Sequence, residues 1–354
     1  MRKVLTLSLL LSLLVMAAVP VMGQDSNTIA DIVVASTEAE EPQFTTLLTA
    51  VQAADPAILE LLSDPEAEVT VFAPTDAAFA ALAEALGEEA FNAILENQAL
   101  LTAILQYHVV PGAVGSADVV ALLEDDMMME DEMATEEAME TEEAMESEEM
   151  MMEPVYVTTA QGIRAPLAQD DMGITIGNAP LNMEMLDIQA DNGIVHVVDA
   201  VMVPPLTTVA DIVVSSTEAE EPQFTTLLAA VQAADPAVLE LLADPLASVT
   251  VFAPTDAAFE AVGEEALNGI LADTALLTDI LQFHVLPGAV YESDVAALLA
   301  DGPVEVTMAN GSVATIEATD MGITIDGATI VMTDVEALNG VVHVIDAVIV
   351  PAEG

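Results

Sequence analysis

An internal repeat constrains the fold of this chain more than any other feature. Residues 28–79 and 208–259 are identical at 45 of 52 positions. After these stretches the alignment of the two copies shifts by four residues. The copies align again at Tyr107-His108 and Phe283-His284, and they end with the related stretches 192–204 and 339–351. A tandem duplication predicts two copies of one fold. Because 354 residues are enough for each copy to bury its own core, we expect modules over residues 24–204 and 205–354.

The first 23 residues have the pattern of a secretory signal peptide. Arg2 and Lys3 precede an uncharged apolar run, and small residues come before Gln24. The run of about 16 residues is short for a membrane span, and no later stretch is apolar enough to cross a bilayer. We therefore predict a secreted protein that acts outside the cell, at its surface or in a periplasm, without insertion into the membrane.

The composition is strongly acidic and lacks cysteine. The chain has 61 Asp and Glu residues against 3 Lys and Arg, of which only Arg164 lies beyond the signal peptide. Such a surface repels nucleic acid and anionic lipid, so neither is an expected partner. Without cysteine there is no disulfide, thiolate nucleophile or sulfur-ligated zinc site. The charge solubilises the protein, and it also suits weak binding of divalent cations or basic partners.

Each copy begins with helical patterns and ends with strand patterns. Apolar residues spaced i, i+3, i+4 and i+7 from Phe44 form one helix face, and Asp55 followed by proline starts another helix. Val69–Ala73 has the pattern of a strand, after which Thr75 or Asp76 caps the next helix. The later β-rich segments are separated by Asn-Gly pairs, which favour tight turns. Helices first and strands afterwards indicate an α+β fold.

Three motifs occur in the same order in both copies. They are VTVFAPTDAAF, then HVVPG or HVLPG, then NGIVHVVDAVMVP or NGVVHVIDAVIVP. On these motifs each copy resembles the fasciclin domain, and the resemblance covers nearly everything after the signal peptide. It implies a compact β-wedge or sandwich with helices packed around it. It also implies adhesion or protein binding at cell surfaces and in extracellular matrix, without enzymatic activity.

The same resemblance implies candidate binding residues. A Tyr-His pair tied to adhesion in animal members matches Tyr107-His108, and Phe283-His284 keeps only its histidine. An Asp-Ile pair ahead of the final strand matches Asp187-Ile188, with Asp334-Val335 as a weaker counterpart. The resemblance implies that these residues contact extracellular or cell-surface proteins, which include other copies of the same chain.

The final strand of each copy sets a histidine three residues before an aspartate, as in His196 with Asp199 and His343 with Asp346. Side chains alternate along a strand, so residues three apart point to opposite faces and cannot form a couple. A central strand would hold its histidine neutral and hydrogen-bonded in the core. We therefore expect His196 and His343 to be structural.

The sequence lacks the motifs of the common catalytic and metal centres. The four histidines, two in each module, have no third ligand in a recognisable metal motif. There is also no nucleophile elbow and no glycine-rich phosphate loop. We accordingly predict no catalytic residues, no metal site and no cofactor.

The first copy carries an acidic, methionine-rich insert at about residues 124–152. It contains 14 acidic residues and nine methionines. Because like charges this dense oppose compact packing, we expect a solvated excursion. The alternative is metal capture, since thioethers suit Cu(I) and clustered carboxylates attract Ca²⁺ weakly. The chain is thus expected to be a secreted adhesion or protein-interaction protein, and the alternative is a secreted cation-binding protein that acts through the insert.

Overall fold

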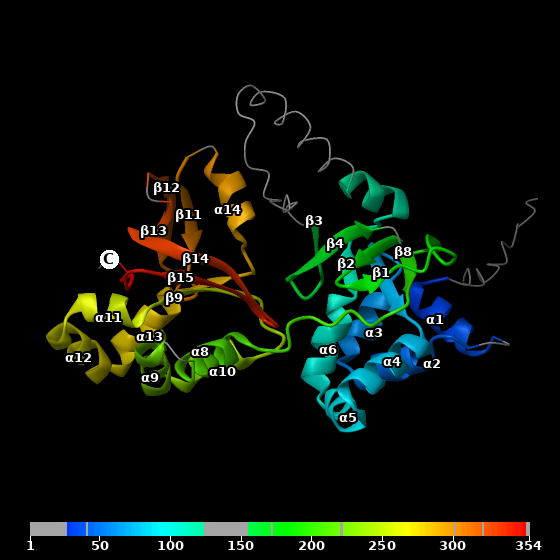
Figure 1. Cartoon of the computed structure of the whole chain (residues 1–354), viewed down its shortest axis with the longest axis horizontal. Helices are drawn as coiled ribbons and strands as arrows, with labels where there is room; N and C mark the ends of the chain where they lie inside the picture. The colour runs from blue at the N-terminus through cyan, green and yellow to red at the C-terminus, as the bar shows by residue number, and fades with distance from the viewer. Residues whose placement is uncertain are drawn as a thin grey trace, which may run out of the picture.

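The computed structural model describes residues 27–39, 42–123, 155–170, 173–219, 222–300, 302–320 and 322–351. The predicted signal peptide and the acidic insert lie outside these ranges. The two copies form two bodies side by side, and in each most of the helices lie below the strands in the view of Figure 1. Within the described ranges, no helix has both the length and the apolar character that a bilayer crossing requires. The α+β fold of two tandem modules is confirmed.

Helices make up the first half of each module. In the first module they are α1 Ile29–Thr37, α2 Thr45–Ala53, α3 Pro56–Ser63, α4 Asp76–Leu86, α5 Glu88–Glu96 and α6 Gln98–Tyr107, and residues 116–123 are also helical. In the second module they are α8 Val209–Thr217, α9 Thr225–Ala233, α10 Pro236–Ala243, α11 Asp256–Val262, α12 Glu264–Ala272, α13 Thr274–Phe283 and α14 Glu292–Leu299. The four-residue slip between the copies falls at the end of α4, which has 11 residues where α11 has 7.

The helix caps follow the sequence signals, with one addition. Asp55 caps α3 and Thr75 caps α4, each through a side-chain oxygen that accepts a hydrogen bond from a backbone N–H. Asp76, the first residue of α4, reaches across to α2, and its carboxylate accepts hydrogen bonds from the backbone N–H groups of Thr45 at 3.2 Å and Thr46 at 2.7 Å. Asp76 thus satisfies two of the donors that the start of α2 leaves without a helical partner.

Removing the Asp76 carboxylate is expected to loosen α2. Asp76→Ala should lower the free energy of unfolding of the first module by about 1–2 kcal/mol, because two N–H groups at the start of α2 lose a charged acceptor. Chemical denaturation followed by circular dichroism measures this loss. Glu84→Ala, which removes an exposed acid from the same helix, is the matched control. A loss no larger than that of the control would contradict the capping role.

Strands make up the second half of each module. The first module has the sheets β2-β1-β8-β7 and β3-β4-β5-β6, and the second has the single sheet β10-β9-β15-β14-β13-β12-β11. In the first module the strands are β1 Val69–Pro74, β2 Val109–Pro111, β3 Val155–Thr158, β4 Arg164–Asp170, β5 Gly173–Ile176, β6 Ala179–Pro180, β7 Ile188–Ala190 and β8 Gly193–Val198. In the second they are β9 Val249–Pro254, β10 Val285–Pro287, β11 Val304–Thr307, β12 Val313–Thr319, β13 Gly322–Ile325, β14 Ala328–Ala337 and β15 Gly340–Ile345.

The two motif strands of each module lie next to one another at its centre. β1 pairs with β8 in parallel, and β9 pairs with β15 in the same way. All six residues of β1 are buried, as are five of six in β8, because helices cover one face of the pair and the second group of strands covers the other. The valine-rich, non-alternating sequence of these strands is typical of strands buried on both faces. The expectation of a central histidine strand is confirmed.

Candidate binding sites

The histidines of the central strands are fully engaged with backbone groups. In β8, His196 accepts a hydrogen bond at Nδ1 from the N–H of Asp187 at 3.2 Å and donates from Nε2 to the carbonyl of Val114 at 2.9 Å. In β15, His343 makes the same two bonds, from Asp334 at 3.2 Å and to the Val290 carbonyl at 2.9 Å. Both rings are therefore neutral with the proton on Nε2.

Neither of these histidines couples with the aspartate three residues further on. Asp199 accepts a hydrogen bond from the Asn182 side chain at 3.0 Å, and Asp346 accepts one from the Thr329 N–H at 2.7 Å. His196 instead stacks on Phe72 of the neighbouring strand, at 5.5 Å between ring centres, and His343 lies tilted against Phe252 at 5.6 Å. Burial lowers the pKa of His343. Both histidines are buried in the core, and a purely structural role for them stays a prediction.

The Tyr-His pair of each module lies in the interior. Tyr107 and His108 are 3% exposed, Phe283 is 0% exposed and His284 is 3% exposed. His108 follows the last residue of α6 and donates from Nδ1 to the Ile104 carbonyl at 2.7 Å, one of the acceptors that a helix end leaves free. Its Nε2 accepts a hydrogen bond from the Met202 N–H at 2.9 Å. His108 thus ties α6 to the segment that follows β8.

His284 repeats this tie in the second module. It bonds the Ile280 carbonyl at 2.8 Å and the Ile349 N–H at 3.2 Å. Burial lowers the pKa of His108 and of His284 to about 4. A contact of Tyr107, His108, Phe283 or His284 with another protein stays a prediction, and at 3% exposure or less these residues can act on a partner only through the neighbours that they position.

The Asp-Ile and Asp-Val pairs, by contrast, reach the surface. Asp187, Ile188, Asp334 and Val335 are all partly exposed, and we call residues 187–188 and 334–335 the Asp segments. Asp187 and Asp334 have φ values of 54° and 57°, in the left-handed region that aspartate tolerates better than most residues. The hydrogen bond from each Asp N–H to the strand histidine fixes this conformation.

The carboxylate in each Asp segment is hydrogen-bonded to the first residue of a helical stretch that precedes it in the sequence. Asp187 accepts hydrogen bonds from the N–H of Ser116 at 2.8 Å and from the Ser116 hydroxyl. These bonds lower the pKa of Asp187. Asp334 accepts one from the N–H of Glu292 at 2.9 Å, at the start of α14. Each Asp segment therefore combines a structural contact with an exposed face.

The bonds of Asp187 to Ser116 predict that this carboxylate contributes to stability. We expect Asp187→Ala to lower the free energy of unfolding by about 1–2 kcal/mol, because the Ser116 donors lose a charged acceptor and alanine is strained at positive φ. Asp187→Asn keeps an acceptor and tolerates this conformation, so its loss should be smaller. Equal urea midpoints for the wild type and Asp187→Ala would contradict the tie to Ser116.

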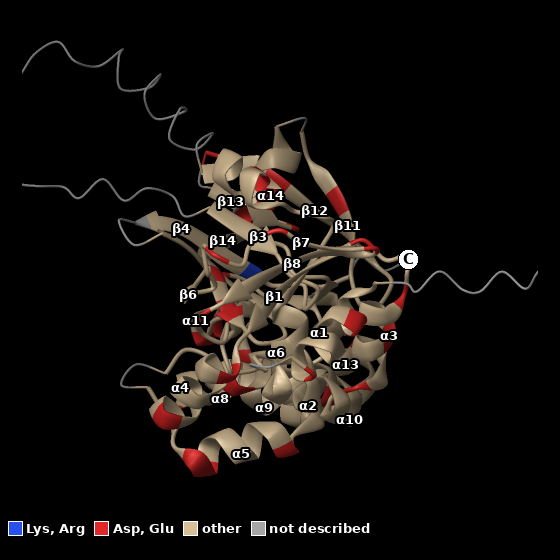
Figure 2. Cartoon of the chain, turned by 90° about the vertical axis from the view of Figure 1, so that its right-hand side faces the viewer, with Lys and Arg blue, Asp and Glu red and all other residues tan. Residues whose placement is uncertain are grey.

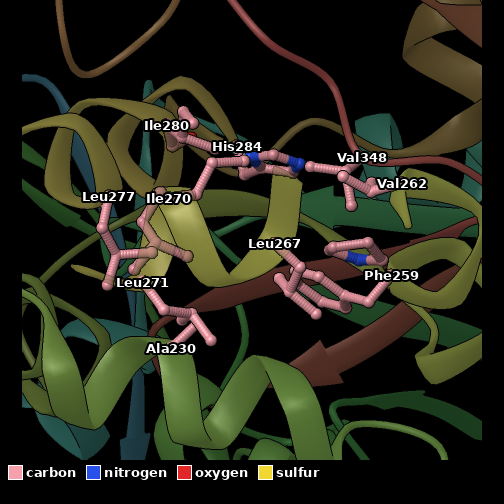
Figure 3. A pocket seen from close by; sticks show the side chains of 12 residues that line it. Ala230, Phe259, Val262, Leu267, Ile270, Leu271, Leu277, Ile280, His284 and Val348 are labelled. Carbon is pink, nitrogen blue, oxygen red and sulfur yellow. Dashed lines mark hydrogen bonds between the residues drawn. The ribbon is translucent and has the colours of Figure 1, made fainter. Parts of the chain in front are cut away.

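The apolar pocket of the second module is too small for a ligand. It lies between α11, α12 and α13 and is lined by Phe259, Leu271 and His284 among others (Figure 3). Its volume is about 20 Å³, close to the ~10–15 Å³ that a single water needs. In the described part of the chain, no group of three or more His, Asp and Glu side chains could hold a metal ion.

A larger pocket lies where the two modules meet. It has a volume of about 420 Å³ and is lined by Tyr156, Arg164, Pro166, Tyr291, Asp334 and Glu336. Burial and the neighbouring Asp334 raise the pKa of Glu336, and Arg164 opposes the rise. The sequence motifs singled out Asp334 but not the pocket, because the other lining residues belong to no motif. Two signals were available: Arg164 is the only Lys or Arg beyond residue 3, and the copies differ at most of the lining positions, Asp334 excepted.

Comparison with known proteins agrees with the motifs. The sequence profile described as "Fasciclin domain" matches residues 42–204 and 222–351. The transforming growth factor-beta-induced protein ig-h3 of Oryctolagus cuniculus is 36% identical over 168 residues, which are 47% of this chain and 22% of that protein. Protein sll1483 of Synechocystis is 39% identical over 130 residues, 36% of this chain and 67% of its own. The chain therefore spans only about a fifth of the mammalian relative.

Two further matches extend the comparison. The immunogenic protein MPB70 of Mycobacterium bovis is 32% identical over 133 residues, 37% of this chain and 64% of its own. A solved FAS1 domain pair from the insect cell adhesion molecule fasciclin I matches 87% of this chain and 96% of that one at 17% identity, with a TM-score of 0.36. The family profile alone accounts for most of the chain and matches it twice. The chain belongs to the fasciclin domain family.

Proposed function

We propose that this protein is a secreted adhesion or protein-interaction protein that acts through its two fasciclin domains outside the cell. The observation that carries the proposal is the repetition of the Asp segment. In both modules an aspartate and a branched aliphatic residue are partly exposed, the aliphatic side chain also packing against the core, on backbone that a buried histidine holds in the same conformation. A surface kept rigid in advance binds a partner at a lower entropic cost.

The four histidine side chains are already occupied by structural bonds. Each of the four histidines bonds backbone groups through both ring nitrogens. A histidine that acts as a general base needs a free ring nitrogen within reach of a substrate. We therefore propose a binding role and not an enzymatic one, with proteins of the cell surface, matrix or periplasm as partners, and with homotypic contacts between copies included.

A capture experiment tests the proposal. The purified chain is immobilised, exposed to the extracellular and envelope fractions of the source cells, and compared with the double variant Asp187→Asn and Asp334→Asn. We expect the wild type to retain a protein that the double variant loses. Glu88→Gln with Glu264→Gln removes two exposed acids from matching positions of α5 and α12 and controls for charge. Equal capture by all three would remove the Asp segments from the function.

The cation-binding alternative concerns the insert, which lies outside the described residues, and it stays a prediction. Calorimetric titration with Cu(I) and with Ca²⁺, using the whole chain and a chain without residues 125–150, separates it from the adhesion proposal. Tight binding that disappears with the deletion would favour the alternative. Weak binding that is the same in both chains is expected from the acidic surface alone.

A further inference from the structure

The modules meet through a hairpin of the first one. The turn between β3 and β4 reaches the second module, where Gln161 donates from Nε2 to the carbonyl of Pro245 at 2.7 Å and to that of Leu338 at 3.1 Å. Gln161 is only 4% exposed. Two hydrogen bonds to backbone carbonyls from one buried amide require a defined position of one module against the other.

Arg164, at the start of β4, contacts three residues of the second module. Its guanidinium lies 2.6 Å from the Asp294 carboxylate and 2.8 Å from the Ser293 hydroxyl. It also lies 4.1 Å from the ring centre of Tyr291, whose hydroxyl accepts a hydrogen bond from the Arg164 N–H at 2.9 Å. The Arg164 side chain is 14% exposed. Arg164 is the only Lys or Arg beyond residue 3, and in Figure 2 red acidic residues accordingly far outweigh blue basic ones.

The duplication supplies an internal comparison for these contacts. The β3–β4 hairpin pairs as the β11–β12 hairpin does, which aligns Gln161 with Asn310 and Arg164 with Val313. Val313 is 55% exposed. On the other side of the junction, Tyr291 stands where the first copy has Gly115. The copies thus differ where one docks on the other, although the same fold accepts both residues.

The contact between Gly162 and Ser248 at the junction also depends on a residue that differs between the copies. A Cβ atom on Gly162 would lie 2.6 Å from the hydroxyl of Ser248, whereas the matching Gly311 has nothing within 4 Å. Ser248 is one of the seven differences within the nearly identical stretch, and the first copy has Glu68 there. Glutamate at position 248 would bring a longer, charged side chain against the Gly162 backbone, so serine is the residue that permits the contact.

We propose that four residues that differ between the copies hold the two modules as one rigid unit. They are Gln161, Arg164, Ser248 and Tyr291, which we call the lock, and the contacts of Arg164 are its central part. Two bodies with a large charge of the same sign repel one another, so specific contacts are needed to hold them together. The lock places Arg164, the only Lys or Arg beyond residue 3, against Asp294 and beside the ring of Tyr291, where the Arg164 side chain is largely shielded from solvent. The proposal of a lock between the modules does not depend on the proposed function.

The absence of cysteine makes the test direct. Glu88→Cys and Glu264→Cys place spin labels at exposed, matching positions of α5 and α12. Pulsed electron resonance then gives the distribution of distances between the modules. We expect a single narrow distribution in the otherwise unchanged chain. Each of Arg164→Val and Ser248→Glu should broaden it roughly twofold or more, because unlocked domains move relative to one another.

Both substitutions install the residue that the other copy has at the matching position, so each module should keep its fold, which circular dichroism checks. Glu68→Ser, the reverse exchange away from the junction, should leave the distribution unchanged. A broad distribution before any lock substitution would overturn the proposal. So would distributions that stay equally narrow in Arg164→Val and Ser248→Glu.

Discussion

Gly193→Ala is expected to unfold the first module. A Cβ atom at this position would lie 1.8 Å from the carbonyl oxygen of Val69 on the paired strand β1, and the φ of 148° is one that other residues rarely adopt. Relief would require the parallel pair of β1 and β8 to separate at the centre of the module. We expect a loss of more than about 4 kcal/mol, a large part of the stability of an ordinary domain.

Thermal unfolding followed by circular dichroism measures this loss. Gly340→Ala should act in the same way on the second module, because its Cβ would lie 1.8 Å from the Val249 carbonyl oxygen. Gly311→Ala is the matched control, since its φ of 84° is also positive but nothing lies within 4 Å. Its expected cost is about 1–2 kcal/mol. Similar losses for Gly193→Ala and Gly311→Ala would contradict the close approach of the central strands.

Acidification from pH 7 to pH 5 is expected to destabilise each module by about 2 kcal/mol through one buried histidine. The folded pKa of His108 and of His284 is about 4, whereas an unfolded histidine titrates near about 6.5. Between these values the unfolded chain binds the proton and the folded module does not, so stability falls as the pH falls. At pH 4 the loss reaches about 3 kcal/mol per histidine, and burial of His343 acts in the same direction.

Nuclear magnetic resonance titration of the ring protons gives these pKa values directly. Urea unfolding at pH 7 and pH 5 gives the change in stability, and His108→Asn should lower stability at pH 7 but weaken its dependence on pH. The hydrogen-bonded carboxylates of Asp76, Asp187 and Asp256 have lowered pKa values, so their contribution is lost only below about pH 4. Histidines that titrate near 6.5 in the folded chain would contradict their buried, neutral state.

The fold was largely predictable because the chain repeats itself and carries strong local signals. The order of helices and strands, the caps at Asp55 and Thr75, and the central histidine strand all follow from spacing and residue type. The Asn-Gly pair at 192–193 was predicted only as a turn. In the structure Asn192 also donates to the carbonyls of Leu62 and Asp64 and accepts from the Ile29 N–H. Contacts this distant in sequence leave no local pattern.

The binding sites and the junction were less predictable, again because contacts between residues distant in sequence leave no local pattern. The sequence gives no measure of exposure, so the buried Tyr107-His108 and the partly exposed Asp187-Ile188 looked alike as candidates. The junction depends on which face of one module meets the other, which no spacing encodes. A comparison of the two copies position by position would have singled out Arg164, since its counterpart is Val313 and no other Lys or Arg lies beyond residue 3.

The central claim is that the two Asp segments form the binding surface, and the affinity of a captured partner tests it most directly. The partner is titrated against the wild type, the Asp187→Asn and Asp334→Asn double variant, and the Glu88→Gln and Glu264→Gln control. We predict that the double variant binds at least about tenfold more weakly, about 1.4 kcal/mol, while its urea midpoint stays close to that of the wild type. Unchanged affinity in a folded double variant would contradict the claim.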